Sequence, residues 1–261
     1  MAIWEQPNLL SGTIPPTIGQ DGIKAEVGLC IIHTGTVSTE WAFRLKLLQI
    51  PPFVYVLNRN QPYDTAREQC TRGVLQHGVE WVFHLDTDVL IPIDAIPKMI
   101  EFSKKFDLPV LSGLYWAKKP NYDDKGNIIP PMPAAWVKYG DFDSIGNKYN
   151  FAPIDAKEFL GKGTLVPVDV IGAGCMLVRA DIFKKLDESN PKKPYFEWGL
   201  GRKDENTGKP LLQLSEDFYF CMRLINELNI HPHVCFNVVC DHEAYVYRRG
   251  EDGQFQLSTR M

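Results

Sequence analysis

Short apolar runs rich in β-branched residues alternate with amphipathic helical patterns through the first half of the chain. The runs are 26–33, 53–57, 81–85 and 109–114, and the helical patterns begin near Thr39, at Asp64 and at Ile93. Runs of this length that end in turn residues are typical of buried strands. Strands that alternate with helices predict an α/β fold, in which a mostly parallel sheet has helices on both faces.

The second half of the chain is less regular. Periodicity stops over 118–164, where prolines and glycines recur, and order resumes at 166–178. Helices are predicted near 181–186 and over 216–228, and a last strand over 233–239, with a second polar stretch at 188–210. Irregular stretches this long inside a compact domain are typical of functional loops, which can hold short strands. We expect a single domain over 1–261 with long irregular loops between core strands.

Charge and hydropathy exclude several kinds of partner. The 28 Lys and Arg against 32 Asp and Glu give a net charge of −4, which disfavours nucleic acid. No apolar run approaches the roughly 20 residues of a membrane-spanning helix, because Asp169 interrupts 166–178. The N-terminus lacks the pattern of a signal peptide. We expect a cytoplasmic protein whose membrane contact, if any, is peripheral, and whose six cysteines are buried thiols rather than disulfides.

Two carboxylates, Asp86 and Asp88, directly follow the third predicted strand. In open α/β sheets, ligands bind outside the carboxyl ends of the strands. Carboxylates at alternate positions can supply the hard oxygen ligands that Mg²⁺ or Mn²⁺ prefers. The hypothesis is a metal that bridges the phosphates of a nucleotide, and the alternative is a turn whose acidic residues cap the next helix.

Two further features lie beside predicted strands. Arg67, in the first turn of the helix that Asp64 begins, could reach anionic oxygens at the strand ends; the alternative is a solvated helix residue. Gly172 and Gly174 interrupt a strand-like run. They indicate a bulge, a close approach of the backbone to a ligand, or tight packing against a neighbour. This pair lacks the third glycine of a dinucleotide-binding fingerprint.

Glu216 and Asp217 follow Ser215 at the start of the last predicted helix. One of these carboxylates is a candidate general base that removes a proton from an acceptor hydroxyl. The alternative is a purely structural role. Ser is a good helix cap, and carboxylates are favoured at the positive end of the helix dipole.

His242 closes the last predicted strand and is a candidate metal ligand through its neutral imidazole. The alternative is an ordinary hydrogen-bonded strand residue. A zinc site built from His233, Cys235, Cys240 and His242 is disfavoured, because strand alternation places the first two on the opposite face from the last two. Trp198, in a polar stretch, is a candidate for stacking on a sugar face, or a surface-anchored loop residue.

Taken in order, five segments of the chain resemble the GT-A glycosyltransferases, and above all their broad inverting family. The segments are EVGLCIIHTGTVSTEW, YDTAREQCTRGVLQHGVEWVFHLDTDVLIP, VDVIGAGCMLVRADIF, LSEDFYFCMRL and CDHEA. The resemblance implies a metal-dependent enzyme of the hexosyltransferase type. Its donor would be a nucleoside diphosphate sugar such as a UDP- or GDP-sugar, and its acceptor a hydroxyl of a glycan, a lipid-linked molecule or a small molecule.

Carried over by position, the resemblance implies a nucleotide-binding half at about 24–117 and an acceptor- and metal-binding half at about 118–250. The nucleotide pocket would be lined by Thr34, Gly35, Thr36 and Asn58, with Arg67 at the donor diphosphate or ribose. The Mn²⁺ or Mg²⁺ and the donor would be held by Asp86, Asp88 and His242. The sugar would be bordered by Gly172, Ala173 and Gly174, with Asp217 as the base and Glu216 beside it.

The sequence departs from the family in two places. Residues 66–68 read ARE where ARN is commoner, and the QxxRW-type motif of processive synthases is absent. A non-processive enzyme is therefore expected. A nucleotidyltransferase of related fold is disfavoured because HTGTVSTEW, after the first strand, carries no Lys or Arg. The other rival is a non-catalytic nucleotide-sugar-binding protein, which a donor hydrolysis assay would distinguish.

Overall fold

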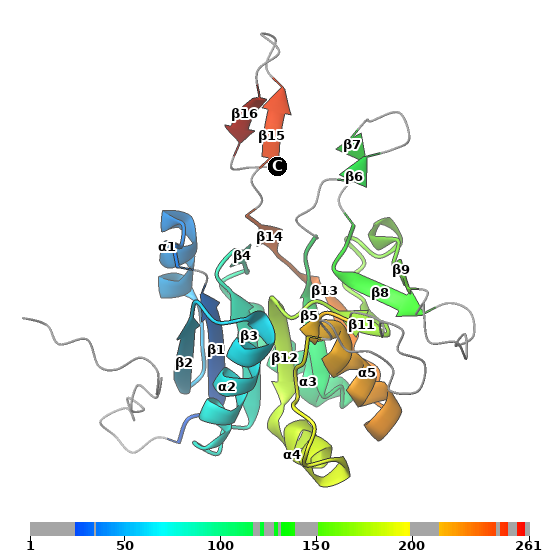
Figure 1. The fold of residues 1–261 in the computed structure, drawn as a ribbon. Helices are drawn as coiled ribbons and strands as arrows, with labels where there is room; N and C mark the ends of the chain where they lie inside the picture. Colours follow the sequence, from blue (N-terminus) through cyan, green and yellow to red (C-terminus); the bar gives the residue numbers. More distant parts are fainter. Residues whose placement is uncertain are drawn as a thin grey trace, which may run out of the picture.

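The centre of the structure is a seven-stranded sheet with the order β10-β13-β5-β12-β3-β1-β2 (Figure 1). The computed structural model describes residues 24–33, 35–116, 132–138, 151–198 and 214–243, and the backbone of 121–122, 128–129, 246–249 and 255–258. The sheet consists of β1 (Val27–His33), β2 (Phe53–Arg59), β3 (Trp81–Asp86), β5 (Val110–Leu114), β10 (Leu165–Pro167), β12 (Cys175–Arg179) and β13 (His233–Val239).

Most strands of this sheet point the same way. β1 is parallel to β2 and β3, and β13 is parallel to β5. β12 is antiparallel to both β3 and β5, and β10 is antiparallel to β13. The mostly parallel α/β sheet predicted from the sequence is confirmed, with β12 and β10 as the exceptions. The predicted run 166–178 is divided among β10, β11 (Val170–Ile171) and β12. Residues 168–169 separate β10 from β11, and a turn at 173–174 separates β11 from β12.

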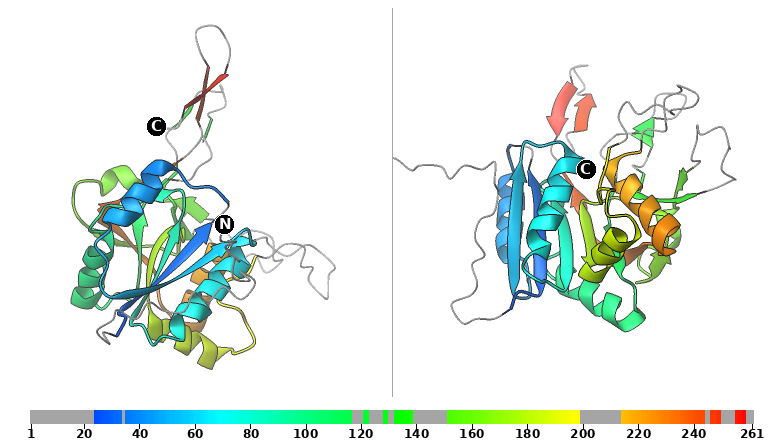
Figure 2. Two further views of the ribbon diagram at one scale, coloured as in Figure 1. Left: turned by 90° about the vertical axis from the view of Figure 1, so that its left-hand side faces the viewer. Right: turned by 60° about the horizontal axis from the view of Figure 1, so that its bottom comes forward.

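Helices cover both faces of the sheet, as predicted. They are α1 (Thr39–Leu47), α2 (Tyr63–Leu75), α3 (Ala95–Phe106), α4 (Ala180–Ser189) and α5 (Glu216–Leu228). Successive strand residues point to opposite faces, so Val82 packs in one core with α2, α4 and α5, whereas its neighbour Phe83 packs in another with α1 and α3. Figure 2 shows the helices on either side of the sheet. Each helix in the described ranges is too short or too polar to cross a lipid bilayer.

The long irregular stretch holds short strands. β8 (Ala135–Lys138) pairs with β9 (Phe151–Pro153) and β11, and the 3-10 helix η2 (Ala156–Glu158) follows. The Phe218 ring of α5 packs on this small sheet, 4.9 Å from the Trp136 ring and 5.1 Å from the Phe151 ring. Two further pairs are β6 (Asn121–Tyr122) with β7 (Ile128–Ile129), and β15 (Val246–Arg249) with β16 (Phe255–Ser258). Residues 118–120, 123–127, 130–131, 139–150 and 199–210 lie outside the described residues.

The five strands that share one direction end at the same edge of the sheet, the upper edge in Figure 1. α2 begins at this edge because it directly follows β2. The short strands β4 (Val89–Leu90) and β14 (Asp241–His242) pair here as well, with His242 opposite Val89. Residues far apart in the sequence are thus gathered where α/β folds bind ligands.

Candidate functional site

The DTD turn and the last strand lie next to each other at this edge. Asp86 is the last residue of β3, and β4 begins one residue after Asp88. The main-chain N–H of Glu243 donates to the carbonyl oxygen of Asp88 at 2.7 Å, and the indole N–H of Trp41 donates to the carbonyl oxygen of Asp86 at 3.1 Å. The turn that carries both carboxylates is therefore held from β14 and from α1.

His242 faces Asp88 through one ring nitrogen. Its Nδ1 lies 2.6 Å from the carbonyl oxygen of Trp116, and its Nε2 lies 3.4 Å from Oδ1 of Asp88. A carbonyl oxygen only accepts, so Nδ1 carries a proton. In the neutral imidazole Nε2 then presents a lone pair to the carboxylate, while Nδ1 makes the second-shell hydrogen bond that is usual for a metal-binding histidine.

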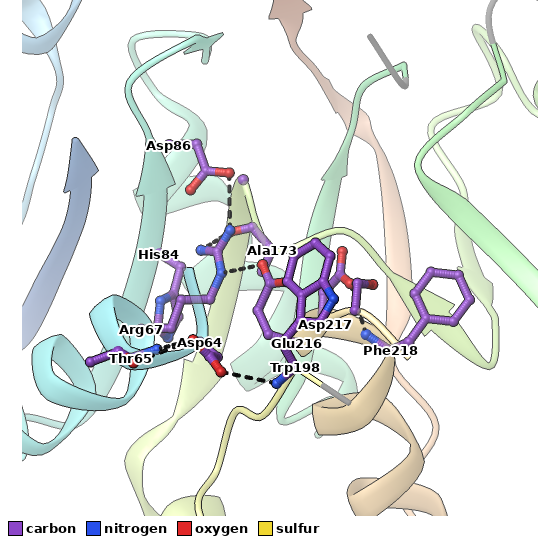
Figure 3. A network of polar contacts seen from close by, with 12 residues as sticks. Asp64, Thr65, Arg67, His84, Asp86, Ala173, Trp198, Glu216, Asp217 and Phe218 are labelled. Atoms are coloured by element: carbon purple, nitrogen blue, oxygen red, sulfur yellow. Dashed lines mark hydrogen bonds and ion pairs between the residues drawn. The ribbon is translucent and has the colours of Figure 1, made fainter. Parts of the chain in front are cut away.

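Arg67 is the link between the two halves of the site. It is 2% exposed, and its three guanidinium nitrogens donate to Oδ2 of Asp86 at 3.0 Å, to Oε1 of Glu216 at 3.1 Å and to the carbonyl oxygen of Ala173 at 3.2 Å (Figure 3). Burial alone would lower the pKa of Arg67, but the carboxylates of Asp86 and Glu216 outweigh it and raise the pKa. The interpretation of Arg67 as a solvated helix residue is wrong: the guanidinium is buried and engaged by protein groups.

The two carboxylates at the start of α5 differ in their surroundings. Glu216 is 5% exposed, and burial raises its pKa to about 6, with Arg67 opposing the shift and Asp217 adding to it. The carboxylate of Asp217 accepts at Oδ1 from the Ser215 hydroxyl and, at 2.8 Å, from the Phe218 N–H. Burial also raises the pKa of Asp217. Ser215 is the N-cap residue of α5, yet its hydroxyl donates to Asp217 and accepts no backbone N–H of the first helical turn.

Among the residues that the structure describes, the charges gathered here do not balance. One guanidinium, Arg67, serves the region of three carboxylates, Asp86, Glu216 and Asp217. Oδ1 of Asp86 is buried and has no hydrogen-bond partner among the described residues. A buried carboxylate oxygen without a donor is costly. Within the described part of the chain, the site therefore has an unused oxygen ligand and a deficit of positive charge.

Gly172 and Gly174 are required by close packing inside the protein. A Cβ on Gly172 would collide with the Tyr115 hydroxyl, and a Cβ on Gly174 would lie 2.9 Å from Val89 and 3.2 Å from Oδ2 of Asp86. The N–H of Gly174 donates to the Tyr115 hydroxyl at 2.9 Å, and the Asp86 N–H donates to the Gly174 carbonyl at 3.0 Å. The sequence left three explanations for these glycines: a bulge, a close approach to a ligand, or tight packing against a neighbour. The contacts with Tyr115 and Val89 are tight packing.

Tyr115 is a site residue that sequence reasoning missed. It is 6% exposed, and its ring meets that of His242 edge-on, with 5.4 Å between centroids. Burial raises the pKa of its hydroxyl, which therefore stays neutral. Its place directly after the predicted strand 109–114, at the edge where ligands bind, is the signal that could have found it.

The residues predicted to line the nucleotide pocket lie at the ends of β1 and β2. Thr34 is outside the described residues. Gly35 and Thr36 follow β1, and the Gly35 N–H donates to Nδ1 of His33 at 2.7 Å. The Asn58 side chain donates to Gln69 of α2 at 2.7 Å. These positions share the edge with Asp86, although Asn58 already has a protein partner.

No assembled metal cluster is found in the part of the chain that the structure describes. There, no three side chains of His, Cys, Asp or Glu gather closely enough to hold an ion. Asp88 and His242 contact each other, whereas Asp86 pairs with Arg67. All six cysteines are buried free thiols, and Cys235 and Cys240 join no such group with His233 or His242.

The sequence matches no protein-family model and no curated protein. Among solved structures, the crystal structure of A197 from STIV is similar with a TM-score of 0.51 and 14% identity, over 90% of this chain and 95% of that one. GalNAc-T7, crystallised with UDP, GalNAc and Mn²⁺, is similar with a TM-score of 0.50 and 9% identity, over 83% of this chain and 42% of that one. The fold is similar to that of a GT-A glycosyltransferase. At these identities the GT-A-like likeness concerns the fold alone.

Proposed function

We propose that the protein is a metal-dependent, non-processive glycosyltransferase that moves a hexosyl group from a UDP- or GDP-sugar to an acceptor hydroxyl. The observation that carries the proposal is the bridge through Arg67. On a GT-A-like fold, this bridge joins Asp86 of the DTD turn to the helix start that bears Glu216 and Asp217. A donor-binding group and a candidate base thereby share one site. If the DTD turn and the acidic start of α5 only capped helices, they would not need to lie together.

The side chains at the sheet edge have the chemistry of a divalent-cation site, and they would have to move closer together to hold the ion. Oδ1 of Asp88 and Nε2 of His242 face each other, and Asp86 has a buried oxygen without a donor among the described residues. Carboxylate oxygen and imidazole nitrogen suit Mn²⁺, and the oxygens suit Mg²⁺. Asp86, Asp88 and His242 would hold the ion, which when bound supplies positive charge to the departing diphosphate.

Asp217 is the base in this proposal, and Glu216 supports it. Glu216 is committed to Arg67 and is buried, whereas Asp217 uses only Oδ1 within the described residues, for Ser215 and Phe218. In transfer, Oδ2 of Asp217 takes the proton of the acceptor hydroxyl. The acceptor oxygen bonds to the anomeric carbon, and the bond from that carbon to the diphosphate oxygen breaks, with its electron pair leaving on the diphosphate.

The remaining assignments belong to the same proposal. Thr34, Gly35, Thr36 and Asn58 would face the nucleotide, and Gly172, Ala173 and Gly174 would face the donor sugar. The Trp198 indole would stack on a sugar face. Arg67 was expected at the donor diphosphate or ribose. In this proposal its guanidinium instead orients the carboxylates of Asp86 and Glu216, to which it donates. The acceptor would be a glycan, a lipid-linked molecule or a small molecule. The chain would form a single domain with a nucleotide-binding half and an acceptor- and metal-binding half. The enzyme would act in the cytoplasm.

The test is a thermal-shift screen of UDP and GDP with and without Mn²⁺, followed by assay of donor hydrolysis. A ligand that binds only the native state raises the melting temperature by mass action, so a nucleoside diphosphate should raise it more with Mn²⁺ than alone. Slow Mn²⁺-dependent hydrolysis of a nucleotide sugar separates an enzyme from a binding protein. A protein that shows neither the shift nor hydrolysis is not this transferase.

A further inference from the structure

A short strap, residues 193–198, is fixed to α2 by its backbone N–H groups. The N–H groups of Tyr195 and Phe196 donate to Oε2 of Glu68 at 2.7 and 3.3 Å. The N–H of Trp198 donates to Oδ2 of Asp64 at 3.1 Å. Asp64 and Glu68 are one turn apart on the same helix face. Their two carboxylates together accept hydrogen bonds from three backbone N–H groups of the strap. Bonds of this kind, with an ionised acceptor, are about twice as strong as neutral ones.

The start of the strap is held from the other side as well. Arg223 of α5, 4% exposed, donates to the carbonyl oxygens of Lys193 and Pro194 at 3.3 and 2.9 Å. Tyr195 and Phe196 are 1% and 2% exposed, and both rings belong to the core beneath α2, α4 and α5. The strap is therefore rigidly placed before it reaches Trp198.

Trp198 differs from the two aromatic residues that precede it. Its backbone is anchored like theirs, yet the residue is 36% exposed, whereas Tyr195 and Phe196 bury their rings. An ordered backbone beneath an exposed indole suits that ring to act as a contact surface.

Asp64 ties this indole to the proposed catalytic site. It lies three residues before Arg67 on α2, hence on the same helix face, and Arg67 holds Asp86 and Glu216. Asp64 also accepts from the Thr65 N–H at 2.7 Å, which fixes its own side chain at the first turn of α2. Figure 3 shows Asp64, its bond to Trp198 and the Arg67 network together.

We propose that Asp64 is a positioning residue that holds Trp198 as a stacking platform for a ring of a carbohydrate acceptor. A pyranose has an apolar face of C–H groups, and a fixed indole offers a flat, amphipathic surface to it at little entropic cost. The acceptor class is thereby narrowed from any hydroxyl compound to a sugar. The inference rests on the proposed transferase function. Asp64 is chosen rather than Glu68 because Asp64 accepts from Trp198, at the exposed end of the strap, whereas Glu68 accepts from Tyr195 and Phe196.

The experiment compares the full-length wild type with Asp64→Ala, Asp64→Asn and Trp198→Phe. Asp94→Ala is the matched control, since Asp94 also stands at a helix start and contacts only Lys98 among its ion pairs in the described residues. The emission that Trp198→Phe removes is assigned to Trp198. Its quenching by acrylamide is measured, and each variant is titrated with methyl glycosides of glucose, galactose, mannose and N-acetylglucosamine. The shift in melting temperature with UDP and Mn²⁺ is recorded in parallel.

Asp64→Ala should increase the quenching of Trp198 and weaken binding of the glycoside preferred by the wild type about tenfold, the factor for one lost charge-assisted hydrogen bond. Asp64→Asn keeps an acceptor oxygen and should restore most of that loss. Trp198→Phe should weaken glycoside binding at least as much, whereas Asp94→Ala should match the wild type. The shift with UDP and Mn²⁺ should be the same in all five proteins.

Three results would overturn the inference: no glycoside alters wild-type emission, Trp198→Phe binds the sugar as the wild type does, or Asp64→Ala changes neither quenching nor sugar affinity. Because Trp198→Phe alters an exposed side chain, it tests the platform even if Asp64→Ala fails to fold. A wild type that binds glycosides through Trp198 but shows no nucleotide shift would contradict the proposed transferase and leave the platform standing.

Discussion

Replacing Arg67 with Met tests whether the buried guanidinium holds the site together. The side chain of Arg67 is 3% exposed and pairs with Asp86 and Glu216, whose side chains are 20% and 7% exposed. Removing one partner of a buried ion pair typically costs about 3–5 kcal/mol, because the other charge is left without compensation. We expect a loss in this range at pH 8, measured as the free energy of unfolding in urea. The control Lys98→Met breaks an exposed pair with Asp94 and should cost about 1 kcal/mol or less.

The pH dependence of this loss distinguishes a lost charge partner from a lost packing contact. The pKa of Glu216 is about 6 in the folded protein against a usual 4.5, and without Arg67 it should rise further. A carboxyl whose folded pKa is raised adds stability below its unfolded pKa, and this contribution disappears as pH rises through the folded pKa. The deficit of Arg67→Met should therefore shrink from pH 8 to pH 5. An equal deficit at both values, or one below about 1 kcal/mol at pH 8, would refute the reasoning.

Four other changes have defined outcomes. Asp217→Asn should keep its melting temperature and lose about 100-fold or more in turnover. Burial raises the pKa of Asp217 above 3.8, so wild-type activity should decrease as the pH is lowered through that raised pKa. Lost stability with full specific activity would instead assign Asp217 to the helix. Asp88→Ala should abolish transfer and weaken Mn²⁺-dependent nucleotide binding; unchanged turnover would remove it from the site. His242→Ala should raise the Mn²⁺ concentration needed for activity at an unchanged melting temperature, whereas a lower melting temperature would point to a structural role. Gly172→Ala should destabilise by about 1–3 kcal/mol through contact with the Tyr115 hydroxyl, and adding Tyr115→Phe should recover part of it.

The strands and helices were predictable because their signals are local. Val27–His33 and Trp81–Asp86 are continuous apolar runs buried on both faces, and the α5 stripe repeats at helical spacing. The run 166–178 was harder, because Gly172 and Gly174 are required there by close contacts with distant residues, among them Tyr115, which directly follows β5. Periodicity carries no information about such a partner.

The site was predictable in its parts but not in its connections. Strand ends indicated Asp86, Asp88 and His242, and the structure brings the last two within 3.4 Å. Arg67 is buried because it pairs with Glu216 of α5, which lies far along the chain. The periodicity of its own helix therefore could not show whether Arg67 is buried or exposed. The anchoring of Trp198 by Asp64 likewise joins two segments that no spacing rule relates.

The position of β12 determines the order in which this molecule can assemble. β12 pairs with β3 on one side and β5 on the other, yet it follows both in the chain. During synthesis, β3 and β5 each keep an open edge until β12 emerges, and open strand edges favour aggregation. Pairings between such distant segments also form slowly. Since β13 and β14 come later still in the chain, His242 is synthesised after every strand in the middle of the sheet. A chain stalled before that stage would carry Asp86 and Asp88 without their histidine.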